Sequence, residues 1–344
     1  MKRGKIVAWV ALGLLLSSTF GAPSVIEAQG PDGRWPLQPM SRQNRIIAPF
    51  MEGWYANEDG TYSISFGYLN RNADVVEIPL GEDNFIEPAQ FDGMQPTYFE
   101  PGHPRGLFTV NLPASMKDVS VWWNIRSPNG ELNRVPGRAT ASAYQLDWIP
   151  RPHGSVPPRV TFDGQGEAGR GPPGIMAERV WTARVGQQIV LAVNAEDISV
   201  RDVTERRFRD IAVRATWAKH QGPVGGKVEF TRHESNPEPP PAEGRGGRGG
   251  RGGAAADSVG GNAPPAAAAA AAAGAAGFGG RGGPPLPQVI SLAEGRGTAQ
   301  VYASFSAPGE YVMRVQVDNF GAPDSTSGDQ CCWTNGYVRV NVTP

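Results

Sequence analysis

Short runs of alternating apolar and polar residues follow one another from residue 49 to residue 148. In the run TYSISFGYLN, the alternation places four large side chains on one face of a strand: Tyr62, Ile64, Phe66 and Tyr68. The run GLFTVNL alternates in the same way, and Asn-Glu-Asp-Gly at 57–60 predicts a hairpin turn. No stretch of a dozen residues has the helical period, so the pattern predicts an antiparallel β-sandwich over residues 46–150.

A second series of strand-like runs begins near Pro157 with PPRVTF and continues through QQIVLAVNAED and IAVRATWAKHQG. After a long interruption, three further strands are expected in the last roughly 60 residues. Three strands leave a large exposed sheet face, whereas a sandwich of this kind needs about seven. We therefore expect the C-terminal strands to complete a sandwich that spans residues 156–344.

The interruption at 234–287 is rich in Gly, Pro, Ala and Arg and contains the string EGRGGRGGRGG. Such a composition predicts a disordered surface loop, and inserting it costs only about 0.6 kcal/mol of closure entropy per doubling of its length. Arg-Gly-Gly strings occur in RNA-binding proteins. Here the segment has a nearly balanced charge and one aromatic residue, and the whole chain has a net charge of −1. A nucleic-acid partner is therefore not expected.

The end of the chain resembles PKD and related immunoglobulin-like domains. The resemblance is carried by the Pro308-Gly309 turn, the Tyr311 strand and the Asp318-Asn319 loop in APGEYVMRVQVDN, followed by the strand GYVRVNV. Trp217 matches the core tryptophan of the central strand. The resemblance covers roughly 160–230 and 298–344 and implies a fold and a surface location. The expected fold class is all-β, with two tandem antiparallel immunoglobulin-like sandwiches, the second interrupted by the long loop.

Residues 1–28 have the layout of a secretory signal peptide, with a basic start, an apolar run and small residues up to Ala28. An uncleaved anchor is the alternative, but the apolar run is shorter than the roughly 20 residues that a spanning helix needs. Residues 29–45 are expected to form an N-terminal extension. We expect the mature chain to be secreted or periplasmic, with no integral membrane span.

The only cysteines, Cys331 and Cys332, are adjacent. In an oxidising compartment they have three options, which are a vicinal disulfide, bridges to another chain, or free thiols. Two adjacent thiolates lack the spacing of a zinc ligand pair.

No catalytic motif is present in the sequence: the four histidines have no zinc-site spacing, and no Gly-x-Ser-x-Gly elbow occurs. No cofactor is expected. Clustered oxygen ligands near the C-terminus make Ca²⁺ a candidate ligand, while favoured turn residues are the alternative explanation. The candidate calcium ligands are Asp318, Asp324 and Asp329.

Several tryptophans suggest a ligand platform. Trp122 and Trp123 are adjacent on one expected strand, so their side chains must face opposite sides. An outward indole could stack on a sugar ring, or it could form a packing surface between the two sandwiches. The candidate platform residues are Trp54, Trp122, Trp123 and Trp333.

The sequence as a whole predicts a non-enzymatic binding or structural protein of the cell envelope or extracellular space, with a protein or glycan partner. A carbohydrate-binding accessory module is the first alternative, and a hydrolase that uses carboxylates on the sandwich loops is the second.

Overall fold

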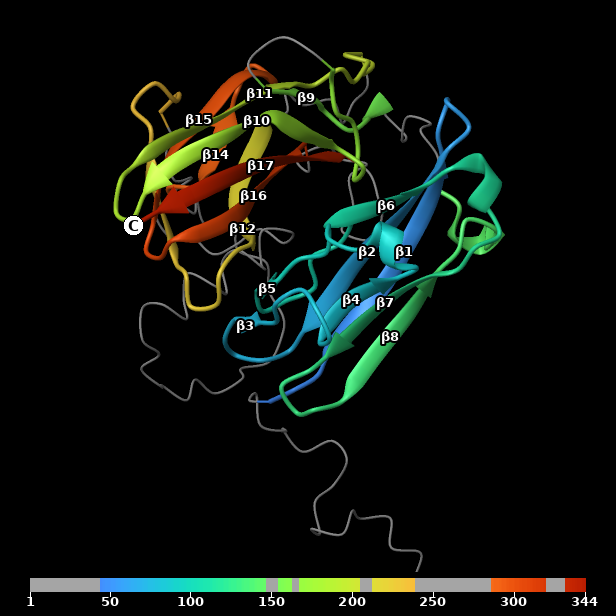
Figure 1. Ribbon diagram of the computed structural model, residues 1–344. Helices are drawn as coiled ribbons and strands as arrows, with labels where there is room; N and C mark the ends of the chain where they lie inside the picture. The colour runs from blue at the N-terminus through green and yellow to red at the C-terminus, as the bar shows by residue number, and fades with distance from the viewer. Residues whose placement is uncertain (1–43, 147–153, 163–166, 205–211, 239–285, 320–331) are drawn as a thin grey trace, which may run out of the picture. The chain divides into compact units, whose positions relative to one another are not determined.

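In a computed structural model of the chain, the described residues are 44–146, 154–162, 167–204, 212–238, 286–319 and 332–344. They form β-strands and three short 3₁₀ helices, with no α-helix among them, so the all-β prediction is confirmed (Figure 1). The predicted signal peptide and residues 29–43 of the predicted extension lie outside the described residues. Within the ranges that are described, no helix is long and apolar enough to cross a membrane.

The first region, residues 44–146, contains three small antiparallel sheets. One sheet has the order β1-β2-β6, with β1 at Ile47–Ala56, β2 at Tyr62–Asn70 and β6 at Phe108–Leu112. A second sheet has the order β4-β7-β8, formed by Asn84–Glu87, Val121–Arg126 and Leu132–Gly137. A two-stranded sheet joins β3, Val76–Glu77, to β5, Tyr98–Phe99. The 3₁₀ helices are η1 at Ala89–Phe91, η2 at Ala114–Met116 and η3 at Ser142–Tyr144.

The predicted alternation decides which residues of β2 and β6 form the core. Ile64, Phe66 and Tyr68 of β2 are buried in one cluster, and Tyr62 packs against it. The predicted turn at 57–60 is confirmed, because the Gly60 amide donates to the Asn57 carbonyl at 3.0 Å, and Gly60 has a φ of 82°. A positive φ of this kind suits glycine, which lacks a Cβ.

Aromatic side chains fill much of this first core. The Trp123 ring is fully buried and contacts the rings of Phe66, Phe99 and Phe108 at centroid distances of 6.0, 6.4 and 5.0 Å. Its Nε1 atom donates to Asn84 Oδ1 at 3.0 Å, so the polar end of the indole is also satisfied. This packing fixes β7 against β2 and β6.

The second region, residues 154–344, contains two larger sheets (Figure 1). The five-stranded sheet has the order β10-β17-β16-β12-β14, formed by Ile175–Arg184, Trp333–Thr343, Gly309–Asp318, Val213–Gln221 and Val289–Leu292. The four-stranded sheet has the order β13-β15-β11-β9, formed by Val228–Arg232, Arg296–Phe305, Ile189–Glu196 and Arg159–Thr161. Strand β10 pairs parallel to β17, and the other pairs are antiparallel.

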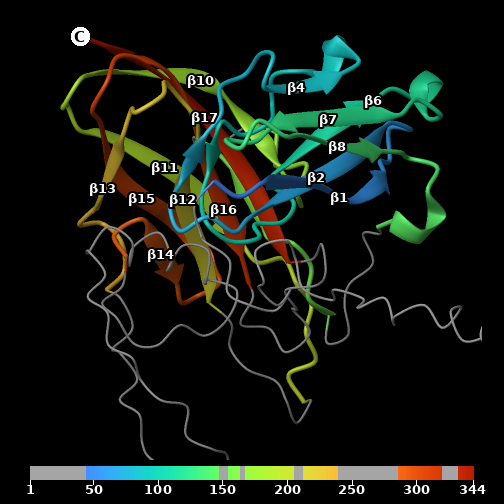
Figure 2. The same cartoon turned by 90° about the horizontal axis from the view of Figure 1, so that it is seen from below.

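Strands from both sides of the long interruption are neighbours in each of these sheets. β12 pairs with β14 and β16, and β11 pairs with β15. In Figure 2, β11 and β15 lie beside β12, β16 and β17. A shared core of mostly Val, Ala and Leu side chains lies between the two sheets and includes the fully buried Trp217.

The interruption itself begins later than residue 234. Glu234 accepts a hydrogen bond from the Tyr302 hydroxyl at 3.0 Å, and Asn236 donates to the Gln300 carbonyl at 2.7 Å. These contacts hold residues 234–236 against β15, which corrects the predicted start. Residues 239–285, the bulk of the predicted disordered loop, lie outside the described residues.

Candidate functional site

Polar side chains of the second region connect it to the first, and we call this set of contacts the joint. Lys219 of β12 is its most buried cation, with a side chain that is 4% exposed. Its Nζ atom donates to Glu77 Oε1 of β3 at 2.8 Å and to the carbonyls of Gly226 and Pro223 at 2.7 and 3.2 Å. All three ammonium donors are thereby used, which is what a buried lysine requires.

His220, the next residue of β12, is also buried in the joint. Its Nε2 atom lies 2.8 Å from the Met94 carbonyl, and its own carbonyl accepts from the Thr97 amide at 2.9 Å. Burial lowers the pKa of the imidazole to about 3, although the bond to Met94 works in the other direction, and the nearby Arg314 lowers it further. His220 is therefore neutral at physiological pH and acts as a fixed hydrogen-bonding group.

Strand β17 closes the other end of the joint. Asn335 donates from Nδ2 to the Gly106 carbonyl at 2.6 Å, and the Tyr337 hydroxyl donates to the Leu107 carbonyl. Arg314 of β16 is buried beside them and donates to Asn335 Oδ1 at 3.2 Å. Burial raises the pKa of the Glu100 carboxyl, and Arg314 partly opposes that shift. Perturbed pKa values often mark catalytic sites, but here they belong to groups that hold two parts of the chain together.

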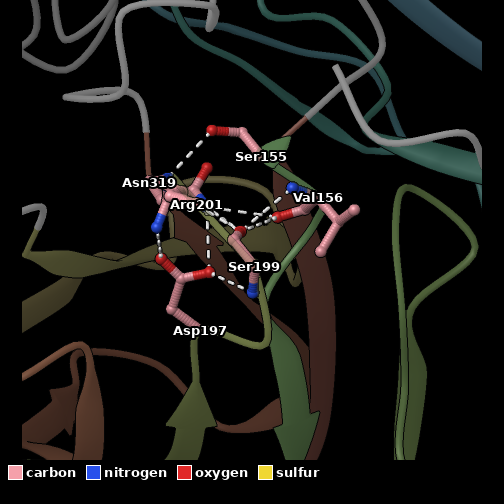
Figure 3. Close-up of polar contacts among 6 residues, drawn as sticks. All are labelled: Ser155, Val156, Asp197, Ser199, Arg201 and Asn319. Carbon is pink, nitrogen blue, oxygen red and sulfur yellow. Dashed lines mark hydrogen bonds and ion pairs between the residues drawn. The ribbon is translucent and has the colours of Figure 1, made fainter. Parts of the chain in front are cut away.

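A second polar cluster ties three loops of the second region together (Figure 3). Arg201 Nη1 donates to Asp197 Oδ2 at 2.7 Å, and Arg201 Nη2 donates to the Ser199 hydroxyl at 3.1 Å. Asn319 donates from Nδ2 to the Val156 carbonyl at 3.1 Å and to Asp197 Oδ1 at 3.3 Å. Burial works to raise the pKa of Asp197, but the bonds from Ser199 and Arg201 outweigh it, so the pKa is lowered. The cluster fixes the end of β16.

The predicted calcium ligands are not brought together in the described structure. Asp318 is buried and accepts two hydrogen bonds from Arg214, at 3.0 and 3.2 Å, so its carboxylate is already paired with a cation. Asp324 and Asp329 lie outside the described residues. Across the ranges that the structure covers, no group of three or more His, Cys, Asp or Glu residues is arranged to hold a metal ion.

Cys332 directly precedes β17 and is fully buried and disulfide-bonded. Its φ of 80° lies in the left-handed region, and its carbonyl accepts the Asn319 amide at 3.0 Å. Cys331 lies outside the described residues, so the vicinal pairing stays a prediction.

The four predicted platform tryptophans differ sharply in exposure. Trp54, Trp123 and Trp333 are buried, with exposed fractions of 5%, 0% and 2%, so they offer no open ring face to a ligand. This corrects the prediction for these three residues. Trp122 faces the opposite side of β7 from Trp123 and is half-buried, as adjacent positions on a strand require. The Arg134 guanidinium lies 4.0 Å from the centre of its ring.

A groove of about 440 Å³ lies between β10 and β11 in the second region. Val180 and Val190 are large apolar side chains on its walls and are 48% and 36% exposed. Arg179 lies over the buried Trp181 ring, 4.9 Å from its centre. The lining residues are Arg179, Val180, Trp181, Thr182, Ile189, Val190 and Ala192.

Unpaired strand edges border this groove. Among the described strands, β10 has a neighbour on one side only, β17. On the groove side of β11, the short strand β9 pairs only with residues 194–196 and leaves the start of β11 uncovered. Unpaired backbone donors and acceptors at a sheet edge are a template for another extended chain.

The groove also has a positive charge. Arg179, which lines the groove, is exposed and pairs with no carboxylate in the described ranges. Sequence reasoning did not find this site. The run RVWTAR reads as an ordinary strand, and which of its edges stays unpaired depends on β17, which is distant in the sequence.

Comparison with known protein families and with curated proteins finds no match to this chain.

Proposed function

We propose that this chain is a non-enzymatic binding protein that works outside the cytoplasm and binds an extended, acidic polypeptide segment in the groove between β10 and β11. The single observation that carries this proposal is the groove itself, which combines unpaired strand edges with exposed valines and an unpaired arginine. The location outside the cytoplasm rests on the leader-like first 28 residues.

Each property of the groove selects a property of the partner. An unpaired edge favours an extended backbone that adds as a strand, and this main-chain pairing provides affinity in many peptide-binding domains. Val180 and Val190 favour apolar side chains at alternate positions of the partner. Arg179 favours a carboxylate at a position between them.

The chemistry of the lining supports binding rather than catalysis. Apart from the Arg179 guanidinium, which stays protonated, the groove is lined by apolar side chains and by the hydroxyl of Thr182. His220 and Glu100, two buried groups with shifted pKa values, lie in the joint instead.

A displayed library of random peptides, selected on the mature protein, tests the proposal. We expect the enriched peptides to be acidic and rich in β-branched residues, and the V180D/V190D variant to bind them at least tenfold more weakly because it adds charge repulsion and removes apolar contact. The matched control is Val224→Asp, which changes an exposed valine outside the groove and should leave the affinity unchanged.

The same protein should be applied to a glycan array. Sugar binding that is lost in Trp122→Ala and retained in V180D/V190D would contradict the proposal and establish the carbohydrate-binding alternative. Enriched peptides that bind V180D/V190D as well as the native protein would also contradict it.

A further inference from the structure

Residues 102–107 form an irregular segment, which we call the strap, that lies along β2. The amides of Gly102 and Asn70 donate to each other's carbonyls at 2.8 Å. The Leu107 amide donates to the Phe66 carbonyl at 2.8 Å, and the Tyr68 amide donates to the Pro104 carbonyl at 3.3 Å. The strap is therefore attached to the first region at both of its ends.

The same strap provides part of the joint. Its Gly106 and Leu107 carbonyls accept the hydrogen bonds from Asn335 and Tyr337 of β17. A displacement of the strap from β2 would move both acceptors, so the attachment of the strap to the first region and the contact with β17 are coupled.

Glu52 of β1 is buried beneath the strap. Its side chain is 7% exposed, and within the part of the chain that the structure describes its Oε1 atom has no hydrogen-bond partner. The His103 Nε2 atom of the strap lies 3.5 Å from Oε1, and the Arg105 Nη1 atom lies 3.7 Å from Oε2. The fit is tight, because a Cβ added at Gly67 would lie 2.7 Å from both Glu52 Oε1 and the Pro104 carbonyl oxygen.

The charged groups around Glu52 do not compensate for its burial. Among the described residues, its ion-pair contacts come from His103 and Arg105 alone, both on the strap. Burial raises the pKa of Glu52 to about 7, against a smaller opposing effect of Arg105. Burial and Arg105 also lower the pKa of His103, so the imidazole contributes little positive charge near neutral pH.

We propose that the strap is a pH-dependent latch: when Glu52 ionises, the strap separates from β1 and β2 to hydrate the carboxylate, and it releases its contacts with Asn335 and Tyr337. A buried carboxylate that lacks hydrogen bonds is unfavourable, and the strap is the segment that covers it. Raising the pH therefore favours the open strap and loosens the joint, whereas acid keeps it closed. The latch is independent of the groove and of the proposed function.

The size of the effect follows from the two protonation equilibria. The ordinary pKa of Glu52 is 4.5, and in the closed strap it is about 7. If the open strap restores the ordinary value, Glu52 alone raises the opening constant on the order of 50- to 100-fold between pH 5 and pH 8, and the lowered pKa of His103 offsets part of this rise.

Amide hydrogen exchange on the full chain tests the latch. The amides of Tyr68, Asn70, Gly102 and Leu107 report strap opening once the rates are corrected for the intrinsic pH dependence of exchange. We expect the native protein to show the rise, and Glu52→Gln to lose it, so that only the opposite and smaller pH dependence of His103 remains. The matched control is Glu58→Gln, an exposed glutamate of the 57–60 turn, which should behave as the native protein.

Two results would overturn the latch. One is an opening constant of the native protein that is the same at pH 5 and pH 8, and the other is an unchanged pH response in Glu52→Gln. If Glu52→Gln fails to fold, carboxyl-carbon NMR of the native protein replaces it. A Glu52 titration midpoint near 7 that coincides with shifts of the strap amides supports the latch, and a midpoint near 4.5 excludes it.

Discussion

The joint and the groove use charged residues in opposite ways. In the joint, Lys219 and Arg314 are buried and donate to carbonyl, carboxylate and amide oxygens of the chain itself. At the groove, Arg179 is exposed and has no described carboxylate partner. The cations of the joint donate their hydrogen bonds to acceptors within the molecule, whereas the groove cation is available to a partner.

This difference gives a practical criterion for locating function. Residues with shifted pKa values are often searched for first, and in this chain His220, Glu100 and Tyr337 would all be selected. Their shifts are caused mainly by burial in a contact between two parts of the chain. The groove is marked instead by unpaired strand edges and exposed apolar side chains, which are features of binding surfaces.

The largest effect is expected from removing the buried charge of the joint. Lys219→Met keeps most of the side-chain volume but leaves Glu77 and two carbonyls without their donor, so we expect the free energy of unfolding to fall by about 2–4 kcal/mol. Arg179→Met at the groove is the matched change of an exposed cation and should cost less than about 0.5 kcal/mol. Urea denaturation of both variants at pH 7 measures the fall in the free energy of unfolding that each substitution causes. Equal falls in the two variants would contradict this prediction.

An effect of similar size is expected from acid, through His220. Its folded-state pKa of about 3 lies below the ordinary 6.5, so the folded state binds this proton less readily than the unfolded state does. Stability is unaffected above pH 6.5 and declines as the pH falls toward 3, by about 3 kcal/mol at pH 4. His220→Gln can still donate to the Met94 carbonyl but cannot be protonated, so this part of the decline should disappear.

Urea denaturation of the native protein and His220→Gln at pH 7, 5.5 and 4 provides the measurement. Other groups titrate in the same range, and Glu52 acts in the opposite direction, because its raised pKa makes the closed form more stable as the pH falls from 7 to 4.5. Subtracting the free energy of unfolding of His220→Gln from that of the native protein at each pH removes these shared contributions. Parallel stability profiles would show that His220 is not buried as a neutral group.

The strands of this molecule could be predicted from local pattern, but the joint could not. The alternation around Phe66 and the turn at Gly60 depend on neighbouring residues, and Trp217 is buried as expected for a central strand. The pairing of Lys219 with Glu77 joins residues that are 142 positions apart in the sequence, and no local pattern marks it. Trp54 and Trp333 were misjudged for the same reason, because their burial depends on elements distant in the chain.

The smallest effect is expected from two contacts of the same type, Arg134 over Trp122 and Arg179 over Trp181. The first has a distance of 4.0 Å to the ring centre, and the second has 4.9 Å. Both arginines are exposed, and a cation over an aromatic ring at such a site contributes about 0.5–1 kcal/mol. The shorter contact should lie near the top of that range and the longer one near the bottom.

Double-mutant cycles separate these contacts from the remaining interactions of each arginine. Arg134 also lies 3.7 Å from Glu87, and both of these side chains are about half exposed, so this ion pair should contribute little. The cycles combine Arg134→Ala with Trp122→Leu, and Arg179→Ala with Trp181→Leu, and compare the coupling free energies from urea denaturation. A larger coupling free energy for Arg179 with Trp181 than for Arg134 with Trp122 would mean that Arg179 stabilises the fold through the Trp181 ring. The groove would then lack the available charge that its proposed acidic partner requires.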